Sequence, residues 1–299
     1  MNSKINLLFL AIVLFIGCAK NEIPKEYLIE IDEFKELSKK SNVKIIDFRK
    51  LAAYNNGHIK NSINIWRSDI EDHSFPYGGM KASKKQLETL FSNLGIDNDD
   101  TLIIFDDKGL CDAARLWWVL QYYNFTNVKL LDGGFTTIKS AKISLTKATS
   151  TFKKSTFTFS PEINKKYYAS KKQLEMAVEN NAIIIDTRTV DEYLGNILKN
   201  GAFVKGKIPK SKLLDWANAI NYSGDKKTKT NLELEEIYNK IGANKNDTIY
   251  VYCHSGVRSA HTTFVLTQLL GYKHVLNYDG SWTEWSYYKK KKQDKLKNQ

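Results

Sequence analysis

A cysteine stands at the end of a predicted strand, in a short loop that also carries a glycine and an arginine. Cys253 follows the β-rich run Thr248–Tyr252 and begins the sequence Cys-His-Ser-Gly-Val-Arg-Ser, which ends at Ser259. A helical pattern begins directly afterwards. Backbone N–H groups of such a loop point inward, and with the positive end of the helix dipole they favour a thiolate and lower the pKa of the cysteine. The spacing therefore predicts a cysteine nucleophile in an anion site.

An arginine lies five positions after this cysteine. The planar guanidinium of Arg258 offers two parallel N–H donors, which suit an oxyanion better than an ammonium group does. We therefore predict that Arg258 closes the anion site. The alternative, a small buried cysteine with a structural role, leaves the glycine and the arginine unexplained. The other loop residues are predicted to line the same substrate site: His254, Ser255, Gly256 and Val257.

The elements that must position this loop belong to an internal repeat, which indicates two domains. At an offset of 147 residues, Gly109 aligns with Gly256 and Asp132 aligns with Asp279. Short β-rich runs alternate with amphipathic helical segments in both copies. This alternation predicts an α/β fold with two tandem domains, each a parallel β-sheet flanked by helices on both faces. The predicted parts are an N-terminal domain at 29–145, a linker at 146–166, a C-terminal domain at 167–288 and a basic tail at 289–299.

The expected strands are 43–48, 102–105 and 128–131 in the first copy and 182–187, 249–252 and 275–278 in the second. The expected helices include 84–94, 113–123 and 259–270. Ligands of parallel sheets bind beyond the carboxyl ends of the strands, and the cysteine loop lies at such an end.

The two copies differ at the reactive position. Asp106 aligns with Cys253, and an aspartate cannot serve as a sulfur nucleophile, so the first domain is predicted to be catalytically silent. Cys111 aligns with Arg258 and does not occupy the nucleophile position. We interpret Cys111 as structural, with a redox partner role as the alternative.

Three further motifs accompany the loop. They are Val275-x-x-Tyr278-Asp279-Gly280-Ser281-Trp282-x-Glu284-Trp285, Asp186-x-Arg188 with Glu192-Tyr193, and Asp47-x-Arg49 with Tyr54 and Gly57-His58-Ile59. In combination with the cysteine loop, they are similar to the motifs of the rhodanese family, specifically its tandem-domain sulfurtransferases. The resemblance extends over residues 29–288.

The resemblance implies a double-displacement sulfur transfer. The Cys253 thiolate would take sulfur from thiosulfate, release sulfite and hold a persulfide, which a thiol or cyanide then accepts. Arg188 and Arg258 would hold the anionic end of the donor, and the alternative for Arg188 is an ion pair with Asp186 or Glu192. A structural ion pair is the expected role of the arginines in the first domain's motifs: Arg49 and Arg115.

The donor depends on the loop sequence. In the mercaptopyruvate branch of the family the loop looks like Cys-Gly-Ser-Gly-Val-Thr, and this chain shares Ser255, Gly256 and Val257 with it. His254 and Arg258 replace the glycine and the threonine, and their added positive charge favours doubly charged thiosulfate. 3-Mercaptopyruvate is the alternative donor.

Other classes of protein fit less well. Tyrosine phosphatases use Cys-x5-Arg around a phosphate, and the spacing from Cys253 to Arg258 is one residue shorter. A non-catalytic sulfur-binding protein of the cell envelope is a further alternative. We expect no cofactor and no metal, because Cys253 and His254 are adjacent and no second ligand pair has suitable spacing.

The N-terminus has the layout of a secretory signal, with Lys4 followed by an apolar run at 5–16. This run is shorter than the roughly 20 residues that span a bilayer. Residues 14–18 resemble a bacterial lipobox, which implies that the signal is 1–18 and that Cys18 becomes the lipid attachment point. A membrane-anchored lipoprotein on the periplasmic side is therefore expected, with a secreted or periplasmic soluble protein as the alternative.

Composition and charge exclude other classes. The chain has 42% hydrophobic and 12% aromatic residues, and this composition excludes a disordered or fibrous protein. The formal net charge of +12 rests partly on the tail, where six lysines oppose Asp294. The other lysines are spread singly, so we expect no nucleic-acid partner. A monomer is compatible with two domains that bury surface against each other, and the oligomeric state stays open.

Overall fold

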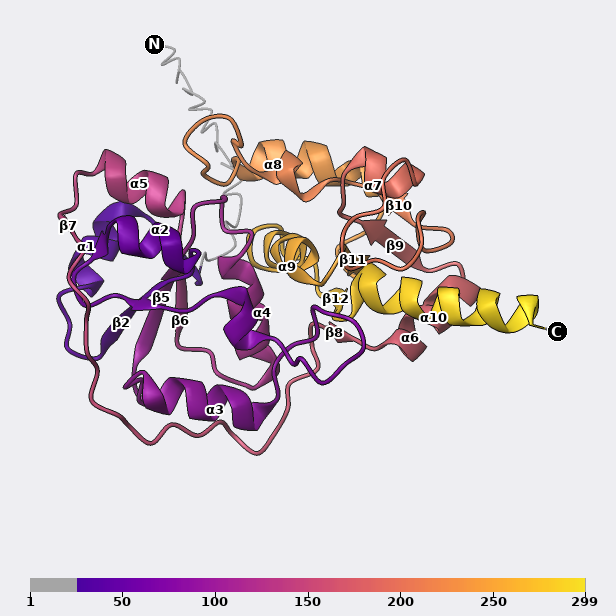
Figure 1. Cartoon of the computed structure of the whole chain (residues 1–299). Helices are drawn as coiled ribbons and strands as arrows, with labels where there is room; N and C mark the ends of the chain where they lie inside the picture. Colours follow the sequence, from indigo (N-terminus) through magenta and orange to yellow (C-terminus); the bar gives the residue numbers. More distant parts are fainter. Residues whose placement is uncertain (1–25, 299) are drawn as a thin grey trace, which may run out of the picture.

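The computed structural model describes residues 26–298 and contains two copies of one α/β unit (Figure 1). The first sheet has the strand order β1-β6-β5-β2-β4, and its strands are β1 (Leu28–Ile29), β2 (Val43–Asp47), β4 (Ile63–Asn64), β5 (Thr101–Phe105) and β6 (Val128–Leu131). The second has the order β10-β9-β11-β12-β8, and its strands are β8 (Tyr168–Ala169), β9 (Ile183–Asp186), β10 (Lys212–Leu213), β11 (Thr248–Tyr252) and β12 (His274–Tyr278). All neighbouring strands of both sheets run parallel. Read from its other edge, the second order is β8-β12-β11-β9-β10, and each strand then matches the strand at the same place in the first order. The internal repeat of the sequence is therefore a repeat of the fold.

Helices cover both faces of each sheet. The first unit has α1 (Ile31–Leu37), α2 (Leu51–Asn56), η1 (Arg67–Ile70), α3 (Lys84–Asn93), α4 (Ala113–Tyr122) and α5 (Gly134–Ser140). The second has α6 (Lys171–Glu179), α7 (Val190–Leu194), η2 (Trp216–Ala219), α8 (Asn231–Tyr238), η3 (Asn239–Ile241), α9 (Val257–Phe264), the π-helical turn η4 (Val265–Leu269) and α10 (Ser281–Lys297). A small antiparallel pair joins β3 (His58–Ile59) to β7 (Leu145–Thr146).

The side chains of β5 show why helices lie on both faces. Ile103 and Phe105 belong to the apolar cluster that includes residues of α1 and α5. Leu102 and Ile104 point the other way and join the cluster that includes residues of α3 and α4. A strand that is apolar on both sides must be covered on both sides, because successive side chains alternate between the faces. The predicted α/β class with helices on both faces is confirmed.

The two units share one core. Nearly every residue of α4 is buried, because this helix lies against α9 of the second unit, as Figure 1 shows. Trp117 of α4 meets Phe264 of α9 edge to face, with ring centroids 5.0 Å apart. A helix that is buried on every side needs packing partners on every side, and the second domain provides some of them.

The connection between the units is packed against the first domain. Between Thr146 and β8 it forms no regular element, as predicted, but Phe157 and Phe159 are buried. The ring of Phe157 lies edge to face with Phe91 of α3, with centroids 5.1 Å apart.

The C-terminus was expected to be a frayed, solvated tail at 289–299; its described residues are mostly exposed, but they are helical. Helix α10 continues through Lys297, and its end projects away from the second domain (Figure 1). The buried Trp282 anchors the first turn of α10. Further along, Lys290 and Asp294 form an exposed ion pair at 2.8 Å, one turn apart, which stabilises the later turns of the helix. No helix within the described part of the chain is long and apolar enough to cross a membrane.

Candidate functional site

Cys253 lies directly after β11, and the loop that follows leads into α9. Gly256 has a φ of 75°, and a Cβ there would lie 2.6 Å from the Asp279 carbonyl oxygen and 2.8 Å from Nη1 of Arg115. Only glycine fits this turn without displacing the backbone. The Cys253 N–H donates to Oγ of Ser281 at 3.2 Å, so the start of α10 holds the loop in place. The predicted sequence of strand, loop and helix is confirmed.

Cys253 is 1% exposed, and its thiol lies where a negative charge is stabilised. Burial by itself raises the pKa of a thiol, but the charge of Arg258 and hydrogen bonds from Ser259 and Ser255 outweigh it, so the pKa of Cys253 is lowered. A lowered pKa gives more thiolate at neutral pH, and the thiolate is the nucleophile. The loop therefore provides what nucleophilic sulfur chemistry needs.

Arg258 is held by a carboxylate of α7. Its Nη1 and Nη2 lie 2.6 and 2.8 Å from the two carboxylate oxygens of Glu192. Burial raises the pKa of Glu192, but Arg258 and Lys199 outweigh it and hold that pKa at about 2. Nζ of Lys199 lies 3.7 Å from Glu192. Arg258 is thus placed where its charge acts on the Cys253 thiol, and Glu192 is a negative partner that the sequence analysis did not assign to it.

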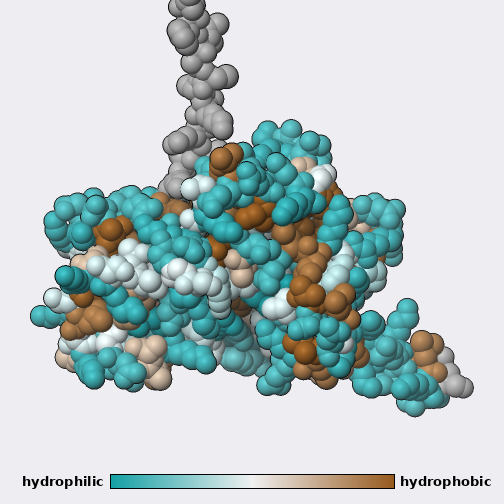
Figure 2. All heavy atoms as spheres, turned by 90° about the horizontal axis from the view of Figure 1, so that it is seen from above, coloured by the Kyte–Doolittle hydropathy of each residue, from teal (hydrophilic) through white to brown (hydrophobic). Residues whose placement is uncertain are grey.

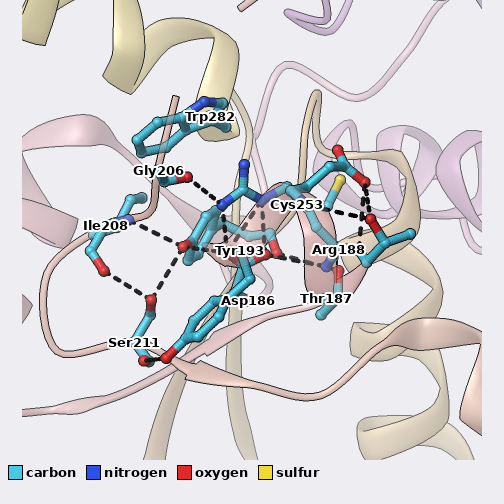
Figure 3. Close-up of polar contacts among 12 residues, drawn as sticks. Asp186, Thr187, Arg188, Tyr193, Gly206, Ile208, Ser211, Cys253 and Trp282 are labelled. Carbon is cyan, nitrogen blue, oxygen red and sulfur yellow. Dashed lines mark hydrogen bonds and ion pairs between the residues drawn. The ribbon is translucent and has the colours of Figure 1, made fainter. Parts of the chain in front are cut away.

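Arg188 is placed differently from the prediction. Its Nε lies 2.9 Å from Oδ1 of Asp186, and its Nη2 lies 2.6 Å from Oδ2 and donates to the Gly206 carbonyl at 2.9 Å (Figure 3). The guanidinium carbon lies 4.8 Å from the ring centroid of Trp282, and the side chain is 2% exposed. Arg188 therefore forms the ion pair with Asp186 that was its alternative role, and its guanidinium is more deeply buried than that of Arg258, at 2% against 12% exposed.

The remaining loop residues have distinct surroundings. Nε2 of His254 lies 2.9 Å from the Asn200 carbonyl oxygen, and burial lowers the pKa of His254 to about 4, so the imidazole is neutral at pH 7. The expectation that His254 adds positive charge for the donor is therefore wrong, because burial disfavours the imidazolium. Ser255 abuts the first domain, since a Cβ on Gly79 would lie 2.5 Å from the Ser255 Cβ. Val257 is buried in a small apolar cluster. Its side chain therefore packs in the protein interior.

The first domain holds the loop from behind. Nη2 of Arg115 lies 2.7 Å from Oδ1 of Asp279, and both side chains are 2% exposed. The same Nη2 donates to the Gly79 carbonyl at 2.8 Å, and Nη1 donates to the Gly256 carbonyl at 3.4 Å. The expected structural ion pair of Arg115 is confirmed, and its partner lies in the other domain. Arg49 also forms its expected pair, with Asp47 at 2.6 Å.

Two cations of the site were missed in the sequence: Arg67 and Lys199. Arg67 begins η1 in the first domain and pairs with Asp112 at the start of α4. Burial lowers the pKa of Arg67, but Asp112, Cys111 and Cys253 outweigh it, so the pKa is raised. Burial and Arg258 lower the pKa of Lys199, while Glu192 and Cys253 oppose the shift. Neither residue belongs to a recognisable motif, and the scarcity of arginine in this chain was the one signal that pointed toward Arg67.

In the first domain a carboxylate fills the position of the nucleophile. Asp106 accepts hydrogen bonds from four backbone N–H groups: Lys108 at 2.9 Å, Leu110 at 3.0 Å, Asp112 at 2.7 Å and Ala113 at 3.0 Å. Burial and the neighbouring Asp112 raise the pKa of Asp106 to about 6, against the effect of these bonds. The anion site of the first copy is thus occupied by the protein's own side chain.

Cys111 packs in the same apolar cluster as Val257, together with Trp216 and Ile220 of the second domain. Burial raises the pKa of its thiol well above the ordinary value. This placement fits the structural interpretation of Cys111. Within residues 26–298, no group of three or more His, Cys, Asp or Glu side chains is arranged to hold a metal ion. Cys18 and the predicted signal 1–18 lie outside the described residues.

The fold and its two loop positions can now be compared with known proteins. The rhodanese-like domain family matches this sequence twice, at residues 30–141 and 170–287. The chain belongs to the rhodanese-like family. Each match coincides with one of the two parallel sheets, so the chain is a tandem rhodanese-like protein with Cys253 in its second domain.

Several relatives and one solved structure cover most of this chain. The Thermus thermophilus protein named "Sulfur carrier protein TtuD" is 31% identical over 271 residues, 87% of this chain and 93% of the relative. A Saccharopolyspora erythraea protein named "Putative thiosulfate sulfurtransferase" is 33% identical over 243 residues, 78% of this chain and 83% of the relative. The crystal structure of SseA from Escherichia coli, described with the 3-mercaptopyruvate sulfotransferases, is similar with a TM-score of 0.73 and 25% identity, over 86% of this chain and 98% of SseA.

Proposed function

We propose that this rhodanese-like protein is a sulfurtransferase that moves sulfane sulfur from thiosulfate to a thiol or cyanide through a persulfide on Cys253. The observation that carries the proposal is the buried Cys253 thiol with a lowered pKa, beside Arg258, at the carboxyl end of β11. The name of the Saccharopolyspora erythraea relative and the description of SseA with the 3-mercaptopyruvate sulfotransferases add support.

The proposed reaction needs two displacements at one sulfur atom. The Cys253 thiolate attacks the outer sulfur of thiosulfate, a new S–S bond forms, and sulfite leaves with the electron pair of the bond that breaks. The acceptor then attacks the outer sulfur of the persulfide, and the electron pair of that S–S bond returns to Sγ of Cys253. The backbone N–H groups of the loop stabilise the negative charge at each stage.

The charges around the thiol support thiosulfate as the donor. Arg258, Arg67 and Lys199 contribute three positive charges, whereas Glu192 and Asp112 contribute two negative charges, which leaves one positive charge before the Cys253 thiolate is counted. We propose that Arg67 and Lys199, together with Arg258, attract the doubly charged donor. 3-Mercaptopyruvate, with one carboxylate, is the second candidate, and the similarity to SseA favours it.

One assay tests both candidates. The purified protein is given thiosulfate and cyanide, then 3-mercaptopyruvate and cyanide, and thiocyanate is measured beside the Cys253→Ser variant. We expect thiocyanate with thiosulfate, none from the variant, and an adduct of about 32 Da on Cys253 by mass spectrometry. Thiocyanate formation by Cys253→Ser would overturn the assignment of the nucleophile. Hydrolysis of p-nitrophenyl phosphate without a sulfur adduct would favour phosphatase chemistry.

We also propose that the protein is a lipoprotein of the cell envelope that is anchored through Cys18. The support is the sequence alone, with its apolar run at 5–16 before Cys18. Two acyl chains anchor a protein firmly, because each buried methylene contributes about 0.8 kcal/mol. Incorporation of labelled palmitate that is lost in Cys18→Ser would support the anchor, and an unlabelled secreted product would contradict it.

A further inference from the structure

Exposed apolar side chains gather on α7 and on the segment that follows it. They are 38% to 61% exposed and comprise Val190, Leu194, Ile197, Leu198 and Phe203. We call this surface the 190–203 face. Figure 2 shows hydrophobic atoms collected on the side of the molecule that carries α7. Apolar side chains scattered singly on a surface are ordinary, but five within fourteen residues of sequence form a patch that indicates an interaction site.

The 190–203 face borders the candidate site. Glu192 of α7 holds Arg258 of the catalytic loop at 2.6 and 2.8 Å. The Asn200 carbonyl lies 2.9 Å from Nε2 of His254, and Lys199 lies 3.7 Å from Glu192. The segment that carries this face therefore also contacts the loop that begins at Cys253, so a molecule that rests on the face lies next to residues of the site.

The charge around these apolar side chains is positive. The exposed charged residues of α7 and of the segment up to residue 210 are Asp191, Lys199, Lys205, Lys207 and Lys210, four positive charges against one negative. This combination is complementary to a partner surface on which acidic side chains surround an apolar centre.

We propose that the sulfur acceptor is a protein with an exposed cysteine among acidic and apolar side chains, and that it docks on the 190–203 face. The proposal rests on the proposed function. A small acceptor such as cyanide contacts only the loop, and it is too small to be bound by the five exposed apolar side chains. A membrane could cover the face but offers no thiol to receive sulfur.

The transfer balances in atoms and electrons. The acceptor cysteine thiolate attacks the outer sulfur of the Cys253 persulfide, and a new S–S bond forms on the acceptor. The old S–S bond breaks, its electron pair stays on Sγ of Cys253, and the acceptor leaves as a persulfide. No external oxidant or reductant is consumed.

Synthetic peptides test the docking surface directly. Two peptides of equal length each carry one cysteine, which is flanked by leucine and aspartate in the first and by serine and glycine in the second. Persulfide formation on each peptide is followed with the full chain, with thiosulfate as the donor. We expect kcat/KM to be about tenfold higher for the leucine–aspartate peptide, because it buries apolar side chains on the face. High salt should reduce this preference, since it screens the lysines.

Matched variants locate the preference. The double variant Leu194→Ser/Leu198→Ser removes two side chains of the face, and Leu51→Ser/Leu296→Ser removes two equally exposed leucines on α2 and α10. We expect the first variant to lose the peptide preference and the second to keep it, while both retain thiocyanate formation with cyanide. Equal rates for the two peptides with the wild-type chain would overturn the proposal.

The remaining outcomes separate other occupants from a protein acceptor. Wild-type dimerisation in analytical ultracentrifugation that is lost in Leu194→Ser/Leu198→Ser would assign the face to a second copy and overturn the proposal. Binding to phosphatidylglycerol vesicles that the same variant loses, with no peptide preference, would assign it to the membrane and overturn the proposal. Absence of any adduct on Cys253 would overturn the proposed function itself. An adduct that passes to cyanide, with no preference between peptides, would overturn only the docking surface.

Discussion

Arg258 donates a hydrogen bond from each of its terminal guanidinium nitrogens to Glu192, at 2.6 and 2.8 Å, so the loop that begins at Cys253 is tied to α7 through a largely buried, bidentate ion pair. The pair places the positive charge of Arg258 near the Cys253 thiol and pairs it with the negative charge of Glu192. The thiolate is stabilised by Arg258, and Glu192 reduces the total positive charge that a donor meets. This single contact therefore links the stability of the domain, the state of the nucleophile and the charge of the site.

Replacing Arg258 should make Cys253 less reactive at neutral pH. Arg258→Gln removes the charge that lowers the pKa of the thiol, so that pKa rises and less thiolate is present. We expect iodoacetamide to alkylate Cys253 at least about tenfold more slowly at pH 7, with the midpoint of the pH profile moved to higher pH. Arg258→Lys keeps the charge and should keep most of the reactivity. An unchanged pH profile in Arg258→Gln would show that the loop N–H groups alone set the thiol pKa.

Glu192 should make the fold sensitive to acid. Its pKa in the folded chain, about 2, lies below the ordinary 4.5, so the ion pair contributes its full stability above pH 4.5 and loses it as the pH falls toward 2. Between pH 6 and pH 3, the wild-type chain should lose about 2 kcal/mol more unfolding free energy than Glu192→Gln does. Urea unfolding at the two pH values measures the difference. Equal losses in the two proteins would contradict the ion pair as the cause.

Asp106 should stabilise the first domain as an acceptor for its loop. Asp106→Ala leaves four buried backbone N–H groups without their partner and should lower the unfolding free energy by about 3 kcal/mol or more. Asp106→Asn keeps one acceptor oxygen and should cost less. Urea unfolding measures both, and persulfide formation on Cys253 in the Asn variant serves as the control for an intact second domain. An Ala variant as stable as the wild type would contradict this role.

The Arg115–Asp279 pair should couple the two domains. Arg115→Met leaves Asp279 buried without its cation and should cost about 3 to 5 kcal/mol. Arg115→Met/Asp279→Asn removes both charges and should recover part of that loss. The comparison is made by urea unfolding of the wild type, both single variants and the double variant. Additive costs in the double variant would show that the two residues do not interact.

Arg67 and Arg188 should differ in their effect on the donor. We expect Arg67→Gln to raise the KM for thiosulfate about tenfold, because a charge that faces the Cys253 site is lost. Arg188→Lys should leave this KM within about twofold of the wild type and lower stability instead, because the guanidinium fork binds Asp186 and Gly206. Steady-state kinetics and urea unfolding of both variants measure these effects. A large rise of KM in Arg188→Lys alone would return Arg188 to the donor site.

Much of the fold followed from the sequence because local patterns determine local elements. The expected strand at 43–48 is β2, Val43–Asp47, and the expected helix at 84–94 is α3, Lys84–Asn93. Ser83 caps α3 through a capping box with Gln86, a signal that is complete within four residues. The C-terminal lysines were misjudged as a tail, because the anchored first turns of α10 make helix extension favourable there.

The sequence by itself determined the repeat, the loop that begins at Cys253 and the aspartate at the matching position of the first domain, since each depends on residues close together in the chain or at one constant offset. Only the tertiary structure decided which carboxylate each arginine meets. Arg258 binds Glu192 of α7, Arg115 crosses to Asp279, and Arg67 enters the site from the other domain. Such partners are set by how the sheets and helices pack, because a guanidinium binds the carboxylate that packing brings within a few ångströms, wherever that residue stands in the sequence.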